Sequence, residues 1–219
     1  MLTITPTATG VGIELRSSIE TMNQLYDLTD VILDINYAVQ DEPEDNRGVM
    51  ILSFAYDIRH AIMAAEYPNE QNQLLPCSIK LIWPDIIIYL MCLRQKAAYV
   101  TLQPKDLELL DLLENELKRA MYAFDPVAAA VNEHLIQPIF DLKSDYLFLL
   151  HTPLHNEYIN TKPRKTAFKK LSSLMHAFFD HAGIQRQFIE HETNAYAKKL
   201  KCAISKLRST EEFLEVKRW

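Results

Sequence analysis

The stretch Gly48-Val-Met-Ile-Leu-Ser-Phe-Ala-Tyr-Asp-Ile-Arg-His-Ala-Ile-Met-Ala-Ala-Glu-Tyr67 decides the fold, because it has the length and the pattern of a central helix. No proline and no further glycine interrupts it, and its apolar residues recur at steps of three and four, the period of one helix face. The opposite side is neither strongly apolar nor strongly charged, and it carries Ser53, Tyr56, Asp57, His60 and Ala64. A helix with two such faces lies under another layer of protein or lines a cleft, and we expect the first arrangement.

The composition bounds the class of protein. The chain of 219 residues is 48% hydrophobic and 24% charged, which is ordinary for one large soluble domain or a domain with an appendage. Four glycines are too few for an all-β sandwich with many tight turns or for a Gly-rich phosphate loop. Three widely spaced cysteines without a CxxC pair indicate a reducing compartment. The most apolar window, Ile79–Leu93, is broken by Lys80 and Asp85, so we expect no membrane span, and residues 1–6 lack a secretory pattern. These features place the protein in the cytoplasm.

Three segments alternate apolar and polar residues and predict a small antiparallel sheet: Leu2–Thr5, Val11–Leu15 and Ser78–Trp83. Helical periodicity predicts helices at about residues 18–36, 48–67, 84–93, 104–124, 126–137 and 144–150. Gln40–Gly48 is expected to be an exposed acidic loop. The predicted fold class is therefore α+β and predominantly helical, with the three-stranded sheet packed on a helical core.

The last part of the chain differs in charge from the rest. Residues 1–150 carry 10 Lys and Arg against 22 Asp and Glu, whereas residues 151–219 carry 13 against 7. Thr161–Arg164 is the candidate boundary between a core domain at 1–160 and a basic appendage at 161–219. Apolar spacing predicts that the appendage is a C-terminal helical hairpin whose first helix stops at Gly183. This basic appendage either docks on the acidic body or binds nucleic acid.

Several short motifs resemble those of an uncharacterised bacterial family that is labelled only as a domain of unknown function. They are Gly10-Val-Gly-Ile13, Leu25-Tyr-Asp27, Tyr56-Asp-Ile-Arg-His-Ala61, Trp83-Pro84 and Leu93-Arg94. The resemblance covers about residues 1–140 and leaves the tail outside. It implies no activity, ligand or partner, and it directs attention to Tyr56–Ala61.

A polar ridge on the predicted central helix supplies the candidate binding residues, Tyr56, Asp57, Arg59 and His60. Asp57 and His60 are three residues apart, so their side chains can meet, and an imidazole oriented by a carboxylate is a workable general base. Arg59 could hold an anionic group. No nucleophile, second carboxylate or metal-ligand spacing accompanies the ridge. We therefore favour a ridge that joins this helix to a neighbouring layer or to a second subunit.

Histidine spacings predict no metal site and no cofactor. His151 and His155 have the four-residue spacing of helical metal ligands, but Thr152-Pro153 resembles a helix start that would leave His151 outside the helix. Two further patterns are interpreted as a solvated helix face and an incomplete zinc-protease motif, namely His176 with Asp180 and His191-Glu192.

Arg186 and His191 have the R-x4-H spacing of helical ribonucleases, in which arginine and histidine steady and protonate a scissile phosphate. Chance alone supplies roughly one such match in a chain with this many arginines and histidines. We therefore favour a soluble, non-catalytic interaction or scaffolding protein that self-associates as a homo-oligomer. The alternative is a ribonuclease-like enzyme that uses Arg186 and His191, or a non-specific nucleic-acid binder that uses the basic tail.

Overall fold

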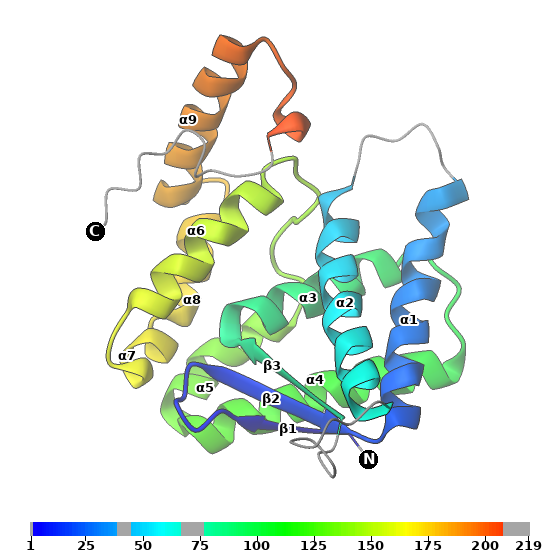
Figure 1. Ribbon diagram of the computed structural model, residues 1–219. Helices are drawn as coiled ribbons and strands as arrows, with labels where there is room; N and C mark the ends of the chain where they lie inside the picture. Colours follow the sequence, from blue (N-terminus) through cyan, green and yellow to red (C-terminus); the bar gives the residue numbers. More distant parts are fainter. Residues whose placement is uncertain (1, 39–44, 67–76, 208–219) are drawn as a thin grey trace.

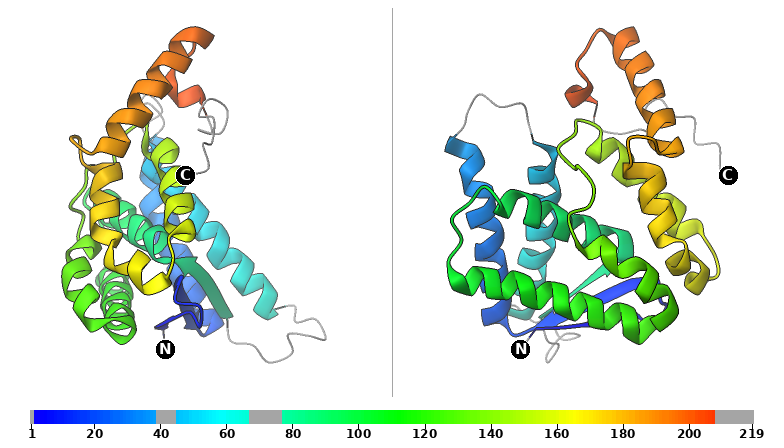
Figure 2. Two further views of the ribbon diagram at one scale, coloured as in Figure 1. Left: turned by 90° about the vertical axis from the view of Figure 1, so that its left-hand side faces the viewer. Right: turned by 180° about the vertical axis from the view of Figure 1, so that it is seen from behind.

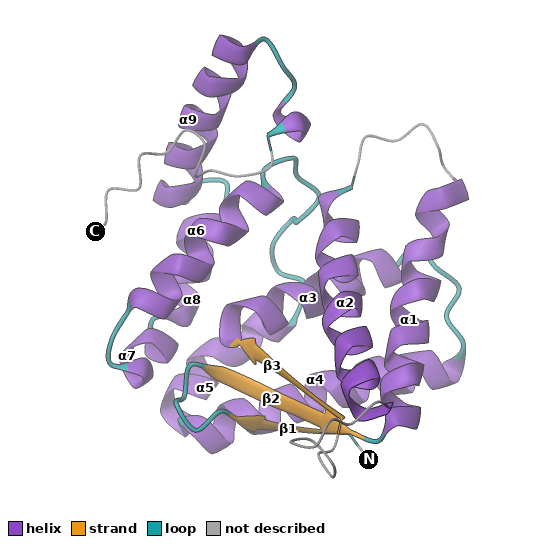
Figure 3. Ribbon diagram, in the orientation of Figure 1, coloured by secondary structure: helices purple, strands orange, loops and turns teal. Residues whose placement is uncertain are grey.

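The computed structural model describes residues 2–38, 45–66 and 77–207, and it is predominantly helical with one small sheet (Figure 3). The strands β1 (Thr3–Pro6), β2 (Gly12–Ser17) and β3 (Cys77–Ile82) are antiparallel and lie in the order β1-β2-β3. Ile4 lies opposite Leu15, and Leu15 lies opposite Ile79, so these side chains form one buried row. The alternation of apolar and polar residues therefore predicted both the strands and the face that the core covers.

Two glycines let the β1–β2 turn approach its neighbours closely. Gly10 has a φ of +70°, and a Cβ there would lie 2.6 Å from the ring of Phe124. A Cβ on Gly12 would lie 1.9 Å from the carbonyl oxygen of Leu81 on β3. The Gly10-Val-Gly-Ile13 motif is thus explained by backbone geometry and close packing.

Helices α1 (Ile19–Ala38) and α2 (Asn46–Glu66) lie side by side above the sheet, and α3 (Trp83–Ala97) runs beside both (Figure 1). All residues of α3 from Trp83 to Leu93 are buried. The sequence explains this burial, because residues 86–93 are apolar on every side of the helix. Pro84 occupies the first turn of α3, where a missing N–H costs no helical hydrogen bond.

A second set of helices packs along the edge strand β1, and the opposite face of the sheet carries exposed side chains, among them Thr5, Arg16 and Lys80. The amphipathic α4 (Pro104–Phe124) packs on β1, and α5 (Pro126–Asn132) and the 3-10 turn η1 (Glu133–Ile136) follow it (Figure 2). Asp125 caps α5 by accepting a hydrogen bond from the backbone N–H of Ala128 at 3.1 Å. Arg94 on α3 donates to Glu114 on α4 at 2.8 Å, which ties the two helices together.

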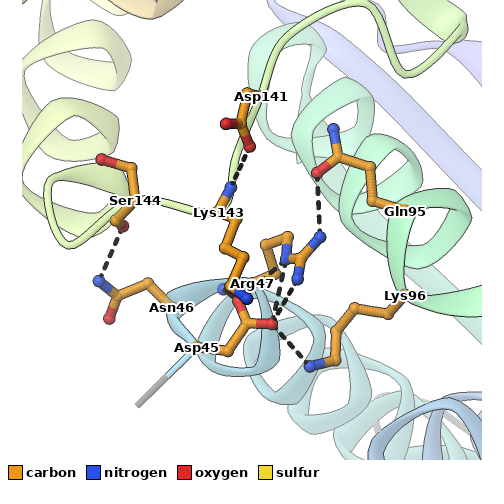
Figure 4. Close-up of polar contacts among 8 residues, drawn as sticks. All are labelled: Asp45, Asn46, Arg47, Gln95, Lys96, Asp141, Lys143 and Ser144. Atoms are coloured by element: carbon orange, nitrogen blue, oxygen red, sulfur yellow. Dashed lines mark hydrogen bonds and ion pairs between the residues drawn. The ribbon is translucent and has the colours of Figure 1, made fainter. Parts of the chain in front are cut away.

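The N-terminus of α2 is held by a buried ion cluster (Figure 4). The Asp45 carboxylate accepts hydrogen bonds from Arg47 Nη2 at 2.7 Å and from Lys96 Nζ at 3.0 Å. Asn46 Nδ2 donates to the carbonyl of Ser144 at 3.0 Å. Residues 40–44 of the expected acidic loop lie outside the described residues. Asp45 departs from the expectation of an exposed loop, because it pairs with two buried cations.

The C-terminal part consists of α6 (Leu147–Asn160), α7 (Arg164–Lys169), α8 (Leu171–Phe179), α9 (Ile184–Leu200) and the turn η2 (Ile204–Lys206). The first helix of the predicted hairpin is divided in two, because Lys170 leaves the helical region with φ −90° and ψ 0°. The prediction that Gly183 closes this helix is wrong. Gly183 has a φ of −64° and precedes α9, and the left-handed residue is Lys201, which ends α9.

Aromatic packing connects the predicted tail to the body. The Trp83 ring lies 4.8 Å from the ring of Phe168 on α7 and 5.9 Å from that of Phe124 on α4. Phe124 and Phe168 are themselves in edge contact at 5.2 Å. Residues on both sides of residue 160 thus share one core. The division into domains at 1–160 and 161–219 stays a prediction.

Within the described residues one helix, α2, is long and apolar enough to cross a bilayer by length and composition alone. Of its most apolar window, 44% is buried inside the protein. Core helices of soluble proteins pass the same test, so α2 is consistent with a soluble protein.

Candidate functional site

The two faces of α2 have different surroundings. Phe54, Ile58 and Ala61 are buried where α2 packs against α1, α3 and β3. On the opposite side Tyr56 is 62% exposed, and Arg59 and His60 are exposed as well. The expectation of a helix covered on both faces is therefore wrong for the described part of the chain. Sequence periodicity identified which face enters the core, but the weak charge of the second face did not imply a covering layer.

The polar ridge divides into an outer group and an inner residue. Tyr56 and His60 stack edge to face on the surface, with ring centroids 4.1 Å apart. Asp57 is partly buried, and its charge interacts with that of Asp85 on α3 as well as with His60. Asp57 thus connects the ridge to Asp85, a carboxylate on another helix.

Helix α6 brings His151 and His155 onto one face, contrary to the sequence prediction. The helix continues through Pro153, which lies inside it. A proline in this place removes one backbone hydrogen bond. Burial of leucine side chains on α6, among them Leu150 and Leu154, offsets that cost. Residues four apart on a continuous helix project in the same direction, so both imidazoles reach the same neighbour.

That neighbour is Asp85, in the first turn of α3. His151 Nε2 lies 3.0 Å from Asp85 Oδ1, and His155 Nδ1 lies 3.2 Å from Oδ1 and 3.1 Å from Oδ2. The three ligand atoms all lie within 4.8 Å of one another, a grouping that could hold a metal ion. The exposed fraction of the side chain rises from 11% for Asp85 through 16% for His151 to 35% for His155. The cluster therefore opens toward solvent on the side of His155.

Electrostatics within the cluster favour a charged carboxylate. Burial raises the pKa of Asp85, but hydrogen bonds from His151 and His155 more than offset this and hold the pKa below its usual value. The hydrogen bond to Asp85 raises the pKa of His155, against the opposing effect of burial. Asp85 thus stays ionised at neutral pH with two imidazoles directed at it.

Two further groups surround this cluster. Burial, and then the charge of Asp85, raise the pKa of Asp57. Burial followed by the charges of Asp85 and Asp57 raises the pKa of Tyr89, which lies one helical turn after Asp85. Helices α2, α3 and α6 therefore each contribute ionisable side chains to one region.

A family comparison matches residues 2–219 to a domain of unknown function, DUF6904. The chain belongs to the DUF6904 family. The match includes the tail that the short motifs left outside their resemblance. No curated protein and no solved structure shows significant similarity to the chain.

In this DUF6904 chain Arg186 and His191 have different surroundings. The Arg186 guanidinium is buried, donates to Glu190 Oε1 at 2.7 Å and donates to the carbonyl of Phe179 at 2.8 Å. His191 is exposed. These two hydrogen bonds join α8 and α9 through Arg186, and the ribonuclease-like pairing of Arg186 with His191 stays a prediction.

Two features of this DUF6904 sequence could have pointed to the cluster of Asp85, His151 and His155. Asp85 is an acidic residue in an otherwise apolar run, and a buried carboxylate needs partners. His151 and His155 have helical ligand spacing, which a proline between them obscured. The partnership between α3 and α6 itself depends on tertiary packing, and nothing local in the sequence encodes it.

Proposed function

We propose that this DUF6904 protein is a non-catalytic interaction protein that pairs with a second copy of itself through the outward face of α2. The observation that carries the proposal is a stripe of exposed apolar side chains on that face. Leu52 and Tyr56 are 52% and 62% exposed, and Val49 and Met63 are 38% and 45% exposed. We call these four residues the α2 stripe.

The spacing of the α2 stripe supports a helix as its partner. Val49, Leu52, Tyr56 and Met63 follow steps of three, four and seven residues, which are the a and d positions of a heptad. Arg59 occupies the remaining position of this seam. The stripe extends about 21 Å along the helix, since each residue rises about 1.5 Å.

The stripe is also self-complementary. Val49 and Met63 are each seven residues from Tyr56. In an antiparallel pair of α2 helices related by a two-fold axis at Tyr56, Val49 of one copy lies opposite Met63 of the other, and the two tyrosines meet at the centre. Symmetric dimers use one patch twice in this manner, and a central tyrosine is a frequent anchor of interfaces.

Sedimentation velocity over a range of protein concentrations tests the proposal, with Leu52→Asp as the disrupting variant. Burying the exposed half of Leu52 contributes about 1 kcal/mol per copy, and the interface contains it twice. The variant also places two unpaired carboxylates in the seam. We expect wild type to dimerise and Leu52→Asp to raise the dimer dissociation constant by more than about 100-fold.

Val127→Asp is the matched control, because Val127 is highly exposed on α5, away from α2. We expect it to dimerise like wild type, and circular dichroism checks that both variants fold. A wild-type protein that remains monomeric at high concentration contradicts the proposal. So does a dimer that Leu52→Asp leaves unchanged.

A further inference from the structure

We infer that Asp85, His151 and His155 bind a divalent transition-metal ion between α3 and α6. The inference rests on the arrangement of three ligand atoms that come from two helices and converge within 4.8 Å of one another. It is independent of the α2 stripe, because the cluster lies between other helices.

The spacing of these atoms suits the ion. Bonds from Zn²⁺ to imidazole nitrogen or carboxylate oxygen are about 2.0–2.2 Å long. Neighbouring ligand atoms on such an ion are therefore about 3.0–3.5 Å apart, in octahedral or tetrahedral geometry. Asp85 Oδ1 lies 3.0 Å from His151 Nε2 and 3.2 Å from His155 Nδ1. The two nitrogens lie within 4.8 Å of each other, so the oxygen and both nitrogens can share an ion once the imidazoles turn toward it.

The donor set indicates the class of metal. Two imidazoles and one carboxylate suit Zn²⁺, Fe²⁺, Co²⁺ or Ni²⁺. Ca²⁺ and Mg²⁺ prefer oxygen ligands throughout. We therefore expect the cluster to select first-row transition ions over Mg²⁺ and Ca²⁺.

The surrounding charges favour a dication. The carboxylate of Asp57 on α2 approaches the region closely enough for its charge and that of Asp85 to repel each other. Burying two like charges is costly unless an opposite charge accompanies them. A divalent ion on Asp85 places two positive charges beside both carboxylates.

The site is accessible from one side. Asp85 is the most buried of the three ligands, and His155 has about a third of its side chain exposed. The ion therefore enters past His155. Among the described residues three protein ligands converge, so water or a small ligand completes the coordination, as in metal sites that keep an open position.

Direct metal titration of the full-length protein tests the inference. The protein is first stripped with a chelator, and Co²⁺ binding is then followed by visible absorption, with competition by Zn²⁺, Mg²⁺ and Ca²⁺. We expect one Co²⁺ per chain, displacement by Zn²⁺, and no displacement by Mg²⁺ or Ca²⁺. His155→Gln and Asp85→Asn should each raise the dissociation constant at least about 100-fold.

His191→Gln is the matched control, because it removes an exposed histidine outside the cluster. It should bind Co²⁺ like wild type. If wild type binds no more tightly than His155→Gln, or if His191→Gln loses the ion as well, the inference is wrong.

A second measurement covers the case in which a ligand variant fails to fold. The chain has seven histidines, and histidine ring signals in the NMR spectrum of wild type report which of them bind Zn²⁺. We expect Zn²⁺ to shift the ring signals of His151 and His155. Unchanged signals for these two, or shifts confined to other histidines, overturn the inference.

Discussion

Replacing Asp45 by asparagine tests whether the ion cluster at the start of α2 stabilises the fold. Asp45 Oδ1 accepts hydrogen bonds from Arg47 Nε at 2.9 Å and from the Arg47 backbone N–H at 3.0 Å. Oδ2 accepts from Arg47 Nη2 and Lys96 Nζ. The three side chains are 13%, 8% and 6% exposed for Asp45, Arg47 and Lys96. Asp45→Asn keeps the shape and removes the charge, which leaves two buried cations without a counterion.

The expected loss of folding free energy in Asp45→Asn follows from two comparisons. Burial raises the pKa of Asp45, but hydrogen bonds from Arg47 and Lys96 outweigh this and lower the pKa from 3.8 to about 2. That difference corresponds to about 2 kcal/mol of folding free energy at neutral pH. Removing one partner of a buried pair costs about 3–5 kcal/mol, because the remaining charge is uncompensated. We expect Asp45→Asn to lose about 3–5 kcal/mol at pH 7.

The pH dependence has a definite sign. The folded-state pKa of Asp45 lies below the unfolded value, so its contribution is complete above about pH 4 and disappears as the pH falls through about 2. The difference in stability between wild type and Asp45→Asn should therefore shrink by about 2 kcal/mol over that interval.

Urea unfolding followed by circular dichroism at several pH values measures both effects. Glu14→Gln is the control, because Glu14 pairs with Arg16 at 2.8 Å on the surface and Arg16 is half exposed. We expect this control to change stability by less than about 1 kcal/mol. Adding Lys96→Met to Asp45→Asn should recover part of the loss, since one buried cation is removed. The reasoning is refuted if Asp45→Asn costs no more than Glu14→Gln, or if its cost stays constant in acid.

Two further substitutions test the packing of the fold by the same urea assay. Phe168→Ala removes the ring between Trp83 and Phe124 and should cost about 3–5 kcal/mol, whereas Phe188→Ala, on the exposed side of α9, should cost less than about 1 kcal/mol. A small effect of Phe168→Ala would mean that residues beyond 160 do not share the core of the body. Gly12→Ala should destabilise by about 3 kcal/mol, because its Cβ would collide with the backbone of β3, whereas Thr9→Ala, in the exposed turn before β2, should change little. Equal stabilities of the Gly12→Ala and Thr9→Ala variants would contradict the close approach.

Local pattern was enough to predict the elements whose residues alternate or repeat strongly. The predicted helix at 104–124 coincides with α4, since its leucines repeat on one side and Pro104 and Phe124 mark its ends. The strands agree to within a few residues for the same reason. Where a local signal competes with packing, prediction failed. Pro153 indicated a helix start, but the buried leucines of α6 carry the helix through it.

The candidate site was harder to predict because its members come from separate elements. Asp57 was singled out from its own helix, yet its neighbour Asp85 lies on α3 and is brought near only by tertiary packing. Likewise Asp45 belongs to an acidic segment that looks exposed in the sequence, and its partners on α3 cannot be inferred from spacing. Sequence periodicity describes one helix or strand at a time, whereas these contacts join residues of two different elements.

The complete burial of α3 between Trp83 and Leu93 has a mechanical consequence. The sheet with α1 and α2 lies on one side of this helix, and α6 lies on another (Figure 1). Any hinge that separated these layers would expose buried apolar side chains of α3, such as Ile86, Ile87 and Leu90, to water. The layers are therefore constrained to move as one rigid unit. Binding at Asp85, in the first turn of α3, would affect the position of all of them together.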